Sequence, residues 1–212
     1  RNLERELGKV CRKIARELVE NGDTGIIKVT SKRLKDYLGV KKYKESEVDT
    51  ESKIGVSTGL AWTSVGGDVL NIEVEFIPGS GKTILTGKLG DVMKESAKIA
   101  ISWVRAVCDE RWGIDKQFWK DHDVHIHVPA GATPKDGPSA GITLTLAIVS
   151  ALTNKKVKGD LAMTGEVTLR GDVLPIGGLK EKLLAAARYG KVNVLVPEAN
   201  RKDLEEVPKQ VL

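Results

Sequence analysis

The chain has 212 residues, with 34 Lys and Arg against 29 Asp and Glu, a formal net charge of +5 and a pI near 9.1. It has no apolar run of the roughly 18 to 20 residues that a membrane-spanning helix needs, and no secretory pattern at its start. Two cysteines are too few for a disulfide scaffold. Because acidic and basic residues are interspersed, the basic pI permits nucleic-acid binding but does not indicate it. We therefore expect a soluble intracellular domain with no membrane segment.

The first residues predict an amphipathic helix. Apolar residues recur every three to four positions between charged ones, and the pattern ends near Asn21-Gly22; the apolar positions are Leu3, Leu7, Val10, Ile14 and Leu18. A single helix of this kind has nothing of its own to pack on, so we expect it to belong to another domain. A short helix over residues 31–38 follows. The charged stretch VKKYKESEVDTE, residues 40–51, then predicts an interdomain linker.

Strands are predicted next, over residues 60–65, 69–77 and 83–89. Gly66-Gly67-Asp68 between the first two is a hairpin signal. The segment Gly79–Thr83 has part of the phosphate-loop pattern GxxxxGK[ST], but Phe76 occupies the position of its first glycine. The segment also lies between two strands and does not open a helix, so we expect a hairpin turn there.

A long helix is predicted over residues 91–111, followed by the strand VHIHV. Because side chains alternate along a strand, His125 and His127 face the same side. A His-x-His pair can bind a metal, but His122 lies in the opposite register and no cysteine-rich ligand set is nearby. We therefore expect no metal site.

The motif KDGPSAG, residues 135–141, precedes the apolar run ITLTLAIVSAL. It places Ser139 in a turn constrained by glycine and proline, at the point where a helix begins. Unpaired backbone N–H groups and the positive dipole end at a helix start can stabilise an oxyanion. Ser139 is therefore predicted to be a nucleophile. The alternative is that it only caps the helix.

Residues 163–178 predict two strands around an Arg170-Gly171-Asp172 turn, and a helix with Lys180 and Lys182 follows. A lysine can serve as the general base for a serine only when it is neutral, which burial among apolar side chains favours. Both lysines flank the apolar stripe of this helix, so periodicity alone leaves both open. A lysine that extends to solvent at the edge of the stripe is the structural alternative.

A second mechanism also stays open, a Ser139–His–Asp triad that uses Asp123 or Asp136. A strand over residues 192–197 and a short acidic helix complete the chain. Strands and helices are mixed without a regular βαβ alternation, so the fold class predicted is α+β with layered mixed sheets.

The segments GLAWTSVGGDVLNIEV, KDGPSAG and AMTGEVTLRGDVLPIGGLKEKLLAA resemble the proteolytic domain of the Lon family of ATP-dependent proteases, in the family's order and spacing over about residues 56–208. The resemblance implies that Ser139 is the nucleophile and that Lys182, not Lys180, is the general base. It implies that the Thr164 hydroxyl helps to hold the lysine. The remaining residues expected to border the site are Gly137, Asp136 and Glu166.

The resemblance also implies a domain organisation and a fold. Residues 1–22 correspond to the last helix of the small helical subdomain of an AAA+ ATPase, residues 23–53 to a helix and charged linker, and residues 54–212 to the proteolytic domain. The expected fold of that domain is similar to domain 2 of ribosomal protein S5.

By the same resemblance, the activity is that of an ATP-dependent serine endopeptidase that cleaves unfolded or damaged polypeptides as a homo-hexamer, in a bacterial cytoplasm or a mitochondrial matrix. ATP and Mg²⁺ would act in an ATPase core outside these residues, so no cofactor is expected here. Two other classes stay open. One is a non-proteolytic oligomerisation or nucleic-acid module, as in relatives without the Ser–Lys pair. The other is a metal hydrolase based on His125 and His127.

Overall fold

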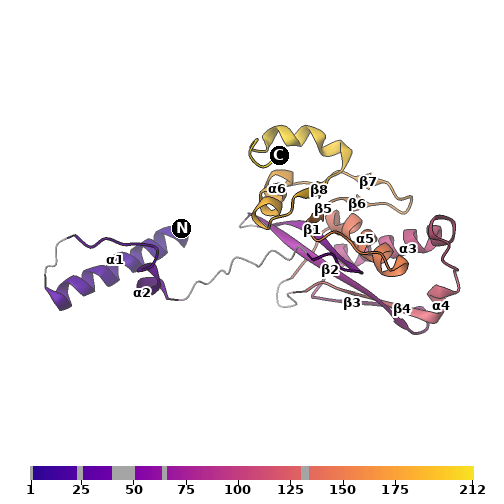
Figure 1. The fold of residues 1–212 in the computed structure, drawn as a ribbon, viewed down its shortest axis with the longest axis horizontal. Helices are drawn as coiled ribbons and strands as arrows, with labels where there is room; N and C mark the ends of the chain where they lie inside the picture. The colour runs from indigo at the N-terminus through magenta and orange to yellow at the C-terminus, as the bar shows by residue number, and fades with distance from the viewer. Residues whose placement is uncertain (1, 23–25, 40–50, 64–65, 130–133) are drawn as a thin grey trace. The chain divides into compact units, whose positions relative to one another are not determined.

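The computed structural model describes residues 2–22, 26–39, 51–63, 66–129 and 134–212. The chain divides into two compact units, Arg1–Ser46 and Glu47–Leu212 (Figure 1). The linker expected at residues 40–51 lies almost wholly outside the described residues, and the expected boundary at residue 54 stays a prediction. Within the described ranges, no helix is long and apolar enough to cross a membrane.

The first unit consists of α1 (Asn2–Asn21) and α2 (Leu34–Leu38). α1 ends where the sequence predicted, whereas α2 begins three residues later than expected. Glu17 on α1 joins the two helices, because its carboxylate accepts hydrogen bonds of 2.7 Å from the Arg33 guanidinium and from the Tyr37 hydroxyl. Leu3 and Leu7 on α1 remain exposed, so this unit does not cover the whole apolar stripe.

The second unit is built on a six-stranded mixed sheet in the order β3-β4-β2-β1-β5-β8. Antiparallel pairs join β1 to β2 and β2 to β4, and parallel pairs join β3 to β4, β1 to β5 and β5 to β8. The strands are β1 (Val56–Thr63), β2 (Gly66–Pro78), β3 (Thr83–Thr86), β4 (His122–His127), β5 (Leu161–Met163) and β8 (Asn193–Leu195). A separate hairpin pairs β6 (Glu166–Val167) with β7 (Val173–Leu174). The α+β class predicted from the sequence is confirmed.

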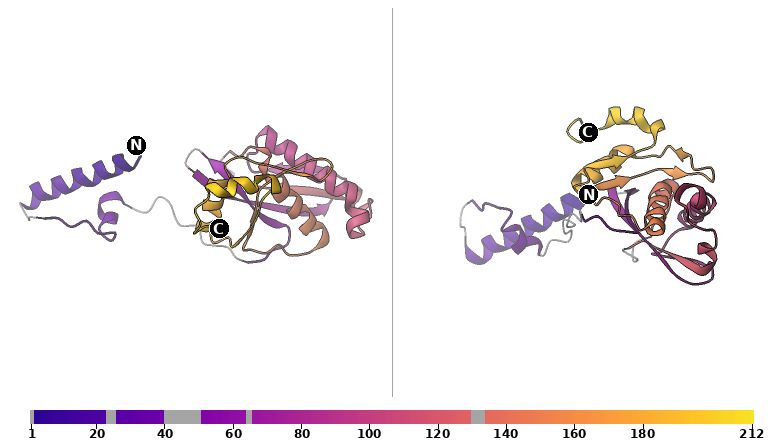
Figure 2. Two further views of the ribbon diagram at one scale, coloured as in Figure 1. Left: turned by 90° about the horizontal axis from the view of Figure 1, so that it is seen from above. Right: turned by 45° about the vertical axis from the view of Figure 1, so that its right-hand side comes forward.

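The two faces of the sheet carry different helices. α3 (Asp91–Trp112) and α5 (Gly141–Thr153) lie side by side on one face (Figure 2). They bury Ile72 and Ile126 of the sheet in the main core. α6 (Leu179–Arg188) packs on the other face, where Ala186 contacts Leu60 of β1. Short segments complete the unit, namely α4 (Phe118–Asp121) and the 3₁₀ helices η1 (Pro138–Ala140) and η2 (Glu198–Glu206).

Two predicted turns are wrong. The β1–β2 register continues to Trp62↔Gly67 and Thr63↔Gly66, so Gly66–Asp68 belong to β2 and do not form the turn. β2 and β3 do not form a hairpin either, because β4 lies between them. The segment between β2 and β3 crosses the end of β4, where the Asp123 carboxylate accepts hydrogen bonds of 2.8 Å from the N–H groups of Ser80 and Lys82. These amides, which a phosphate loop would direct at a nucleotide, are occupied by a carboxylate of the same chain.

α6 approaches the sheet closely because residue 67 has no side chain. A Cβ atom at Gly67 would overlap the Glu181 carbonyl and press on Ala185. The adjacent Arg188 guanidinium and Tyr189 hydroxyl also hydrogen-bond the start of β2, both at 2.8 Å. The position of α6 over the β1–β2 pair therefore depends on a glycine in β2.

We predict that Gly67→Ala lowers the free energy of unfolding by about 1–3 kcal/mol, because overpacking displaces α6 from the sheet. Urea denaturation measures this change. Gly177→Ala is the matched control, since a Cβ there meets no atom within 4 Å, and it should unfold like the wild type. Equal stability of Gly67→Ala and the wild type would contradict the close approach.

Candidate active site

Ser139 lies in η1, one residue before Ala140, which is the N-cap of α5 and forms no side-chain cap hydrogen bond. The interpretation of Ser139 as a helix cap is therefore wrong. Gly137 just before η1 has φ +126° and ψ 156°, a conformation that L side chains rarely adopt. The glycine is thus needed to turn the chain into η1, as the motif predicted.

Asp136 fixes the loop that precedes Ser139 to the start of α3. Its Oδ1 accepts hydrogen bonds of 2.9 Å from the backbone N–H groups of Met93 and Gly137. The Met93 N–H is in the first turn of α3 and has no partner within the helix. The Gly90 N–H also donates to the Lys135 carbonyl at 2.8 Å. Asp136 therefore anchors the loop that carries Ser139 to the first turn of α3.

Lys182 is connected to the Ser139 loop by Thr164. The Lys182 amine donates to Thr164 Oγ1 at 3.1 Å, and Thr164 Oγ1 donates to the Ser139 carbonyl at 3.4 Å. These side chains come from α6 and from the end of β5, while Ser139 precedes α5 on the other face of the sheet. The structure therefore brings together Ser139, Thr164 and Lys182, which are far apart in the sequence.

The environments of the two candidate lysines differ sharply. The Lys182 side chain is 2% exposed, among Leu179, Leu183 and Ala186, whereas Lys180 is exposed. Burial lowers the pKa of Lys182 from its ordinary value of 10.5 to about 8, because an apolar environment disfavours the charged amine. A buried lysine with a pKa near neutrality is suited to act as a base. The surface-lysine alternative therefore fits Lys180 and does not fit Lys182.

Gly165 is a site residue that the sequence reasoning missed. Its N–H donates to the Ser139 carbonyl at 2.8 Å, and its own carbonyl accepts from the Ile142 N–H at 3.0 Å. These two hydrogen bonds join the end of β5 to both η1 and α5. The sequence does contain a feature that could have indicated Gly165, because this glycine directly follows Thr164 in the motif TGE. Glu166 begins β6, next to this contact, and pairs in register with Leu174.

The histidines lie apart from this arrangement. Val124 and Ile126 of β4 are buried beneath α3 and α5, so the alternate residues His125 and His127 face the other side of the sheet. Both rings contact the hydroxyl of Thr86, at 3.0 Å to His125 Nε2 and 2.7 Å to His127 Nδ1. Among the described residues, no group of three or more His, Cys, Asp or Glu side chains is arranged to hold a metal ion.

The triad alternative loses its geometric support. Ser139 is joined to the chain just after β5, whereas the two histidines lie on β4, which β2 and β1 separate from β5 in the sheet. Asp123 is already bound to the segment between β2 and β3, and hydrogen bonds from the Lys82 and Ser80 amides lower the pKa of its carboxyl. Asp136 is directed at α3. The arrangement that remains is the Ser139 loop joined through the Thr164 hydroxyl to the buried amine of Lys182.

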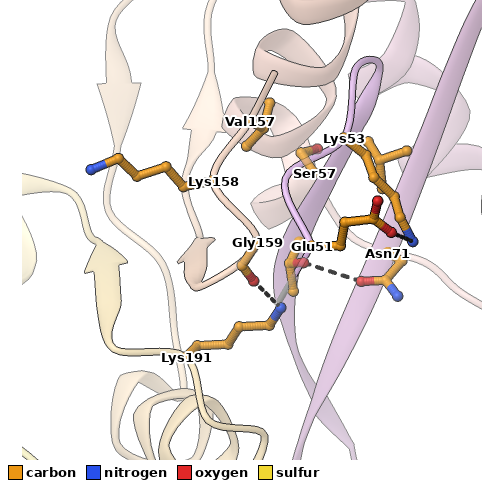
Figure 3. A pocket seen from close by; sticks show the side chains of 10 residues that line it. Glu51, Lys53, Ser57, Asn71, Val157, Lys158, Gly159 and Lys191 are labelled. Atoms are coloured by element: carbon orange, nitrogen blue, oxygen red, sulfur yellow. Dashed lines mark hydrogen bonds and ion pairs between the residues drawn. The ribbon is translucent and has the colours of Figure 1, made fainter. Parts of the chain in front are cut away.

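A small polar hollow lies beside β1 (Figure 3), and Ser139 is not among the residues that line it. Its volume is about 30 Å³, which accommodates only one or two water molecules. The Lys191 amine on its rim donates to the Gly159 carbonyl at 2.6 Å, and Thr58 donates to the Asn71 side chain at 3.2 Å. The hollow is therefore a polar junction between strands, too small for a peptide.

We predict that Lys182→Met stabilises the fold at pH 7 by on the order of 3 kcal/mol, the equivalent of the pKa difference between 10.5 and about 8. The direction in which stability changes with pH follows from the linkage between proton binding and folding. The unfolded lysine binds its proton more tightly than the folded one, so wild-type stability rises with pH from about 8 to 10.5. Below pH 8 Lys182 is charged in the folded state as well, so the full free-energy cost of burying this charge opposes folding.

Thermal and urea unfolding from pH 7 to 10.5 measure this effect. The gap between Lys182→Met and the wild type should close with rising pH. Lys180→Met is the control, because Lys180 is exposed, and its stability should match the wild type at every pH. A gap between Lys182→Met and the wild type that is constant over this range would mean that Lys182 is not a buried lysine with a lowered pKa.

Known protein families match the whole chain. The family model described as the Lon protease (S16) C-terminal proteolytic domain matches residues 28–212, and that of the Lon protease AAA+ ATPase lid domain matches residues 1–27. Similar curated proteins include a Lon protease of Erwinia amylovora, 54% identical over 212 residues, and Lon proteases of Haemophilus influenzae and Nitratidesulfovibrio vulgaris, each 56% identical, over 211 and 213 residues. Each alignment covers 100% of this chain but only 26–27% of the relative, so the chain spans about a quarter of their length. The chain belongs to the Lon protease family, and its residues 28–212 match the serine-type proteolytic domain of that family.

Proposed function

We propose that this domain hydrolyses peptide bonds with Ser139 as nucleophile and Lys182 as general base. The observation that carries the proposal is the buried Lys182 amine, whose pKa is lowered to about 8 and which is hydrogen-bonded through Thr164 to the Ser139 loop. A serine hydroxyl is a weak nucleophile unless an adjacent base accepts its proton. A lysine acts as that base only when it is neutral, and burial supplies the neutral form near pH 8.

In the proposed mechanism, Ser139 Oγ attacks the scissile carbonyl carbon while neutral Lys182 accepts the hydroxyl proton. The resulting oxyanion is stabilised by the Ser139 N–H and a neighbouring amide of the Gly137 loop, close to the positive end of α5. Lys182 then gives the proton to the leaving amine, and the acyl-enzyme forms. Water hydrolyses this ester with Lys182 again as base. Thr164 orients the amine, and Asp136 acts indirectly by holding the loop.

The full-length protein is proposed to degrade unfolded or damaged polypeptides in an ATP-dependent manner. The match of residues 1–27 to an AAA+ lid supports this proposal, as do the relatives named Lon protease. ATP and Mg²⁺ would act in an AAA+ core, and no step of the peptide-bond chemistry above passes through them. We further propose a homo-hexamer, a fold like domain 2 of ribosomal protein S5, and a cytoplasmic location, all by family resemblance.

We predict that Ser139→Ala and Lys182→Ala each reduce peptide cleavage by at least about 1,000-fold, because nucleophile and base act as one unit. Lys180→Ala is the matched control, one exposed lysine two positions away on the same helix, and it should retain most of the activity. Cleavage of a fluorogenic peptide measures all three variants, and circular dichroism verifies the fold. Normal cleavage by Lys182→Ala would refute the dyad. Loss of cleavage in His125→Ala would then favour the triad.

We predict that kcat/KM for a short peptide rises with pH to a plateau above about pH 8, because Lys182 must lose its proton and its pKa is lowered to about 8. Steady-state kinetics between pH 6 and 9.5 test this dependence. A chelator should leave the rate unchanged, whereas loss of activity on chelation would favour the metal hydrolase. Failure to cleave any unfolded protein, even with an ATPase module supplied, would favour the non-proteolytic alternative.

A further inference from the structure

Lys135 opens the motif KDGPSAG, and the proposed mechanism assigns no role to its side chain. The Lys135 amine donates hydrogen bonds to two backbone carbonyls, that of Gly87 at 3.2 Å and that of Val128 at 3.3 Å. Gly87 directly follows β3 and Val128 directly follows β4, and these two strands pair in parallel at one edge of the sheet. The side chain therefore joins the beginning of the loop that carries Ser139 to the ends of both strands.

The two carbonyls lie where one amine can reach both. Gly87 has φ +111°, a conformation that L side chains rarely adopt, and a Cβ atom there would overlap the Val128 carbonyl. The Val128 N–H donates to the Thr86 carbonyl at 3.1 Å, and the Val128 side chain is fully buried in the main core. The ends of β3 and β4 therefore give Lys135 a fixed support.

The backbone of Lys135 is bound to the same part of the fold. Its N–H donates to the Lys88 carbonyl at 3.3 Å, and its carbonyl accepts from the Gly90 N–H at 2.8 Å. Any residue except proline could make these two bonds, because they use the main chain alone. The amine extends the attachment from residues 88–90 to the end of β4. This extension is the part that needs a long side chain with hydrogen-bond donors.

Ser139, at the other end of this loop, is bound to the end of β5. Its carbonyl accepts a hydrogen bond of 2.8 Å from the Gly165 N–H. The loop therefore runs from the ends of β3 and β4 to the end of β5, while Asp136 fixes its middle to α3. Because both ends are bound to the sheet, the attachment at Lys135 determines how the loop reaches β5. It thereby influences where the Ser139 hydroxyl lies relative to Lys182.

A role for Lys135 as the base itself is the alternative, since burial lowers the pKa of its amine too. The hydrogen bonds oppose that role. The Lys135 amine is directed at the carbonyls that follow β3 and β4, whereas the Lys182 amine is linked through Thr164 to the Ser139 carbonyl. In the sheet, β2 and β1 lie between β4 and β5. Lys135 is therefore placed to hold the loop rather than to accept the proton of Ser139.

We propose that Lys135 is a positioning residue of the peptidase, whose amine fixes the loop to the ends of β3 and β4 and so holds the Ser139 hydroxyl within reach of Lys182. The inference rests on the proposed peptidase function and deepens it by naming a residue that acts through Ser139. A lysine suits this role because its amine has three donors on a long stem, and two carbonyls have to be bound. A methionine side chain is of similar length but donates no hydrogen bond.

Steady-state kinetics with the fluorogenic peptide test this role. Lys135→Met should lower kcat by about 10- to 100-fold, the cost of a small misplacement of a reacting group, and should leave KM close to the wild-type value. Lys135→Arg should restore part of kcat, because a guanidinium group also donates to carbonyls. Lys98→Met, a change of an exposed lysine on α3, is the matched control and should behave like the wild type. A wild-type kcat in Lys135→Met would overturn the proposal.

The pH dependence separates a positioning residue from a base. In Lys135→Met, the rise of kcat/KM with pH should keep its midpoint near pH 8, which the pKa of Lys182 sets, and should reach a lower plateau. Loss of this rise in Lys135→Met would assign the base to Lys135 and overturn the proposal. If circular dichroism shows that Lys135→Met does not fold, Lys135→Gln takes its place with the same expected decrease in kcat.

Amide hydrogen exchange followed by NMR examines the loop without catalysis. In the Ser139→Ala background, Lys135→Met should accelerate exchange of the Gly165 amide, which donates to the carbonyl of residue 139, whereas Lys98→Met should not. If the wild type cleaves nothing but this acceleration occurs, the proposed chemistry fails and the attachment of the loop by Lys135 stands. Unchanged exchange at Gly165 in Lys135→Met would overturn the positioning role, whatever the activity of the wild type.

Discussion

The burial of the Lys182 amine is the constraint on which the candidate site depends. Lys182 is 2% exposed, and burial lowers the pKa of its amine from 10.5 to about 8. The neutral form that serves as a base is therefore available at a lower pH than for an exposed lysine. The same burial opposes folding at neutral pH, because the charged form loses its hydration. The Thr164 hydroxyl compensates in part by accepting a hydrogen bond from the amine. Stability and the proposed activity thus conflict at one side chain, as is common at functional sites.

The site also depends on how segments from the two faces of the sheet meet at the end of β5, an inner strand. Ser139 precedes α5 on one face, and Lys182 comes from α6 on the other. Thr164 and Gly165, at the end of β5, lie between these helices and hydrogen-bond the Ser139 carbonyl. The end of β5 therefore sets the spacing between Ser139 and Lys182, the proposed nucleophile and base. Small residues are essential for this geometry, since Gly67 lets α6 approach the sheet.

The loop before Ser139 is held from a third direction by Asp136, which bonds the first turn of α3. A motif such as KDGPSAG contains several polar residues whose roles are indistinguishable in sequence. The structure separates them, because Asp136 makes local backbone contacts whereas Ser139 lies where the loop approaches the end of β5.

Local patterns in the sequence determined most of the elements. Apolar periodicity located the helices at residues 2–21 and 91–112 within one or two residues. It also predicted the helix that carries both lysines, and the glycine-proline turn indicated Ser139. These predictions succeed because helix periodicity and turn chemistry are properties of neighbouring residues. Only the tertiary structure decided which lysine is buried, that β4 lies between β2 and β3, and that Gly66–Asp68 are part of a strand. Each of these three features depends on which segment, distant in the sequence, packs or pairs with the residues concerned. Periodicity could not separate Lys180 from Lys182 because both flank one apolar stripe, and the position of α6 over the sheet determines which of them loses contact with water.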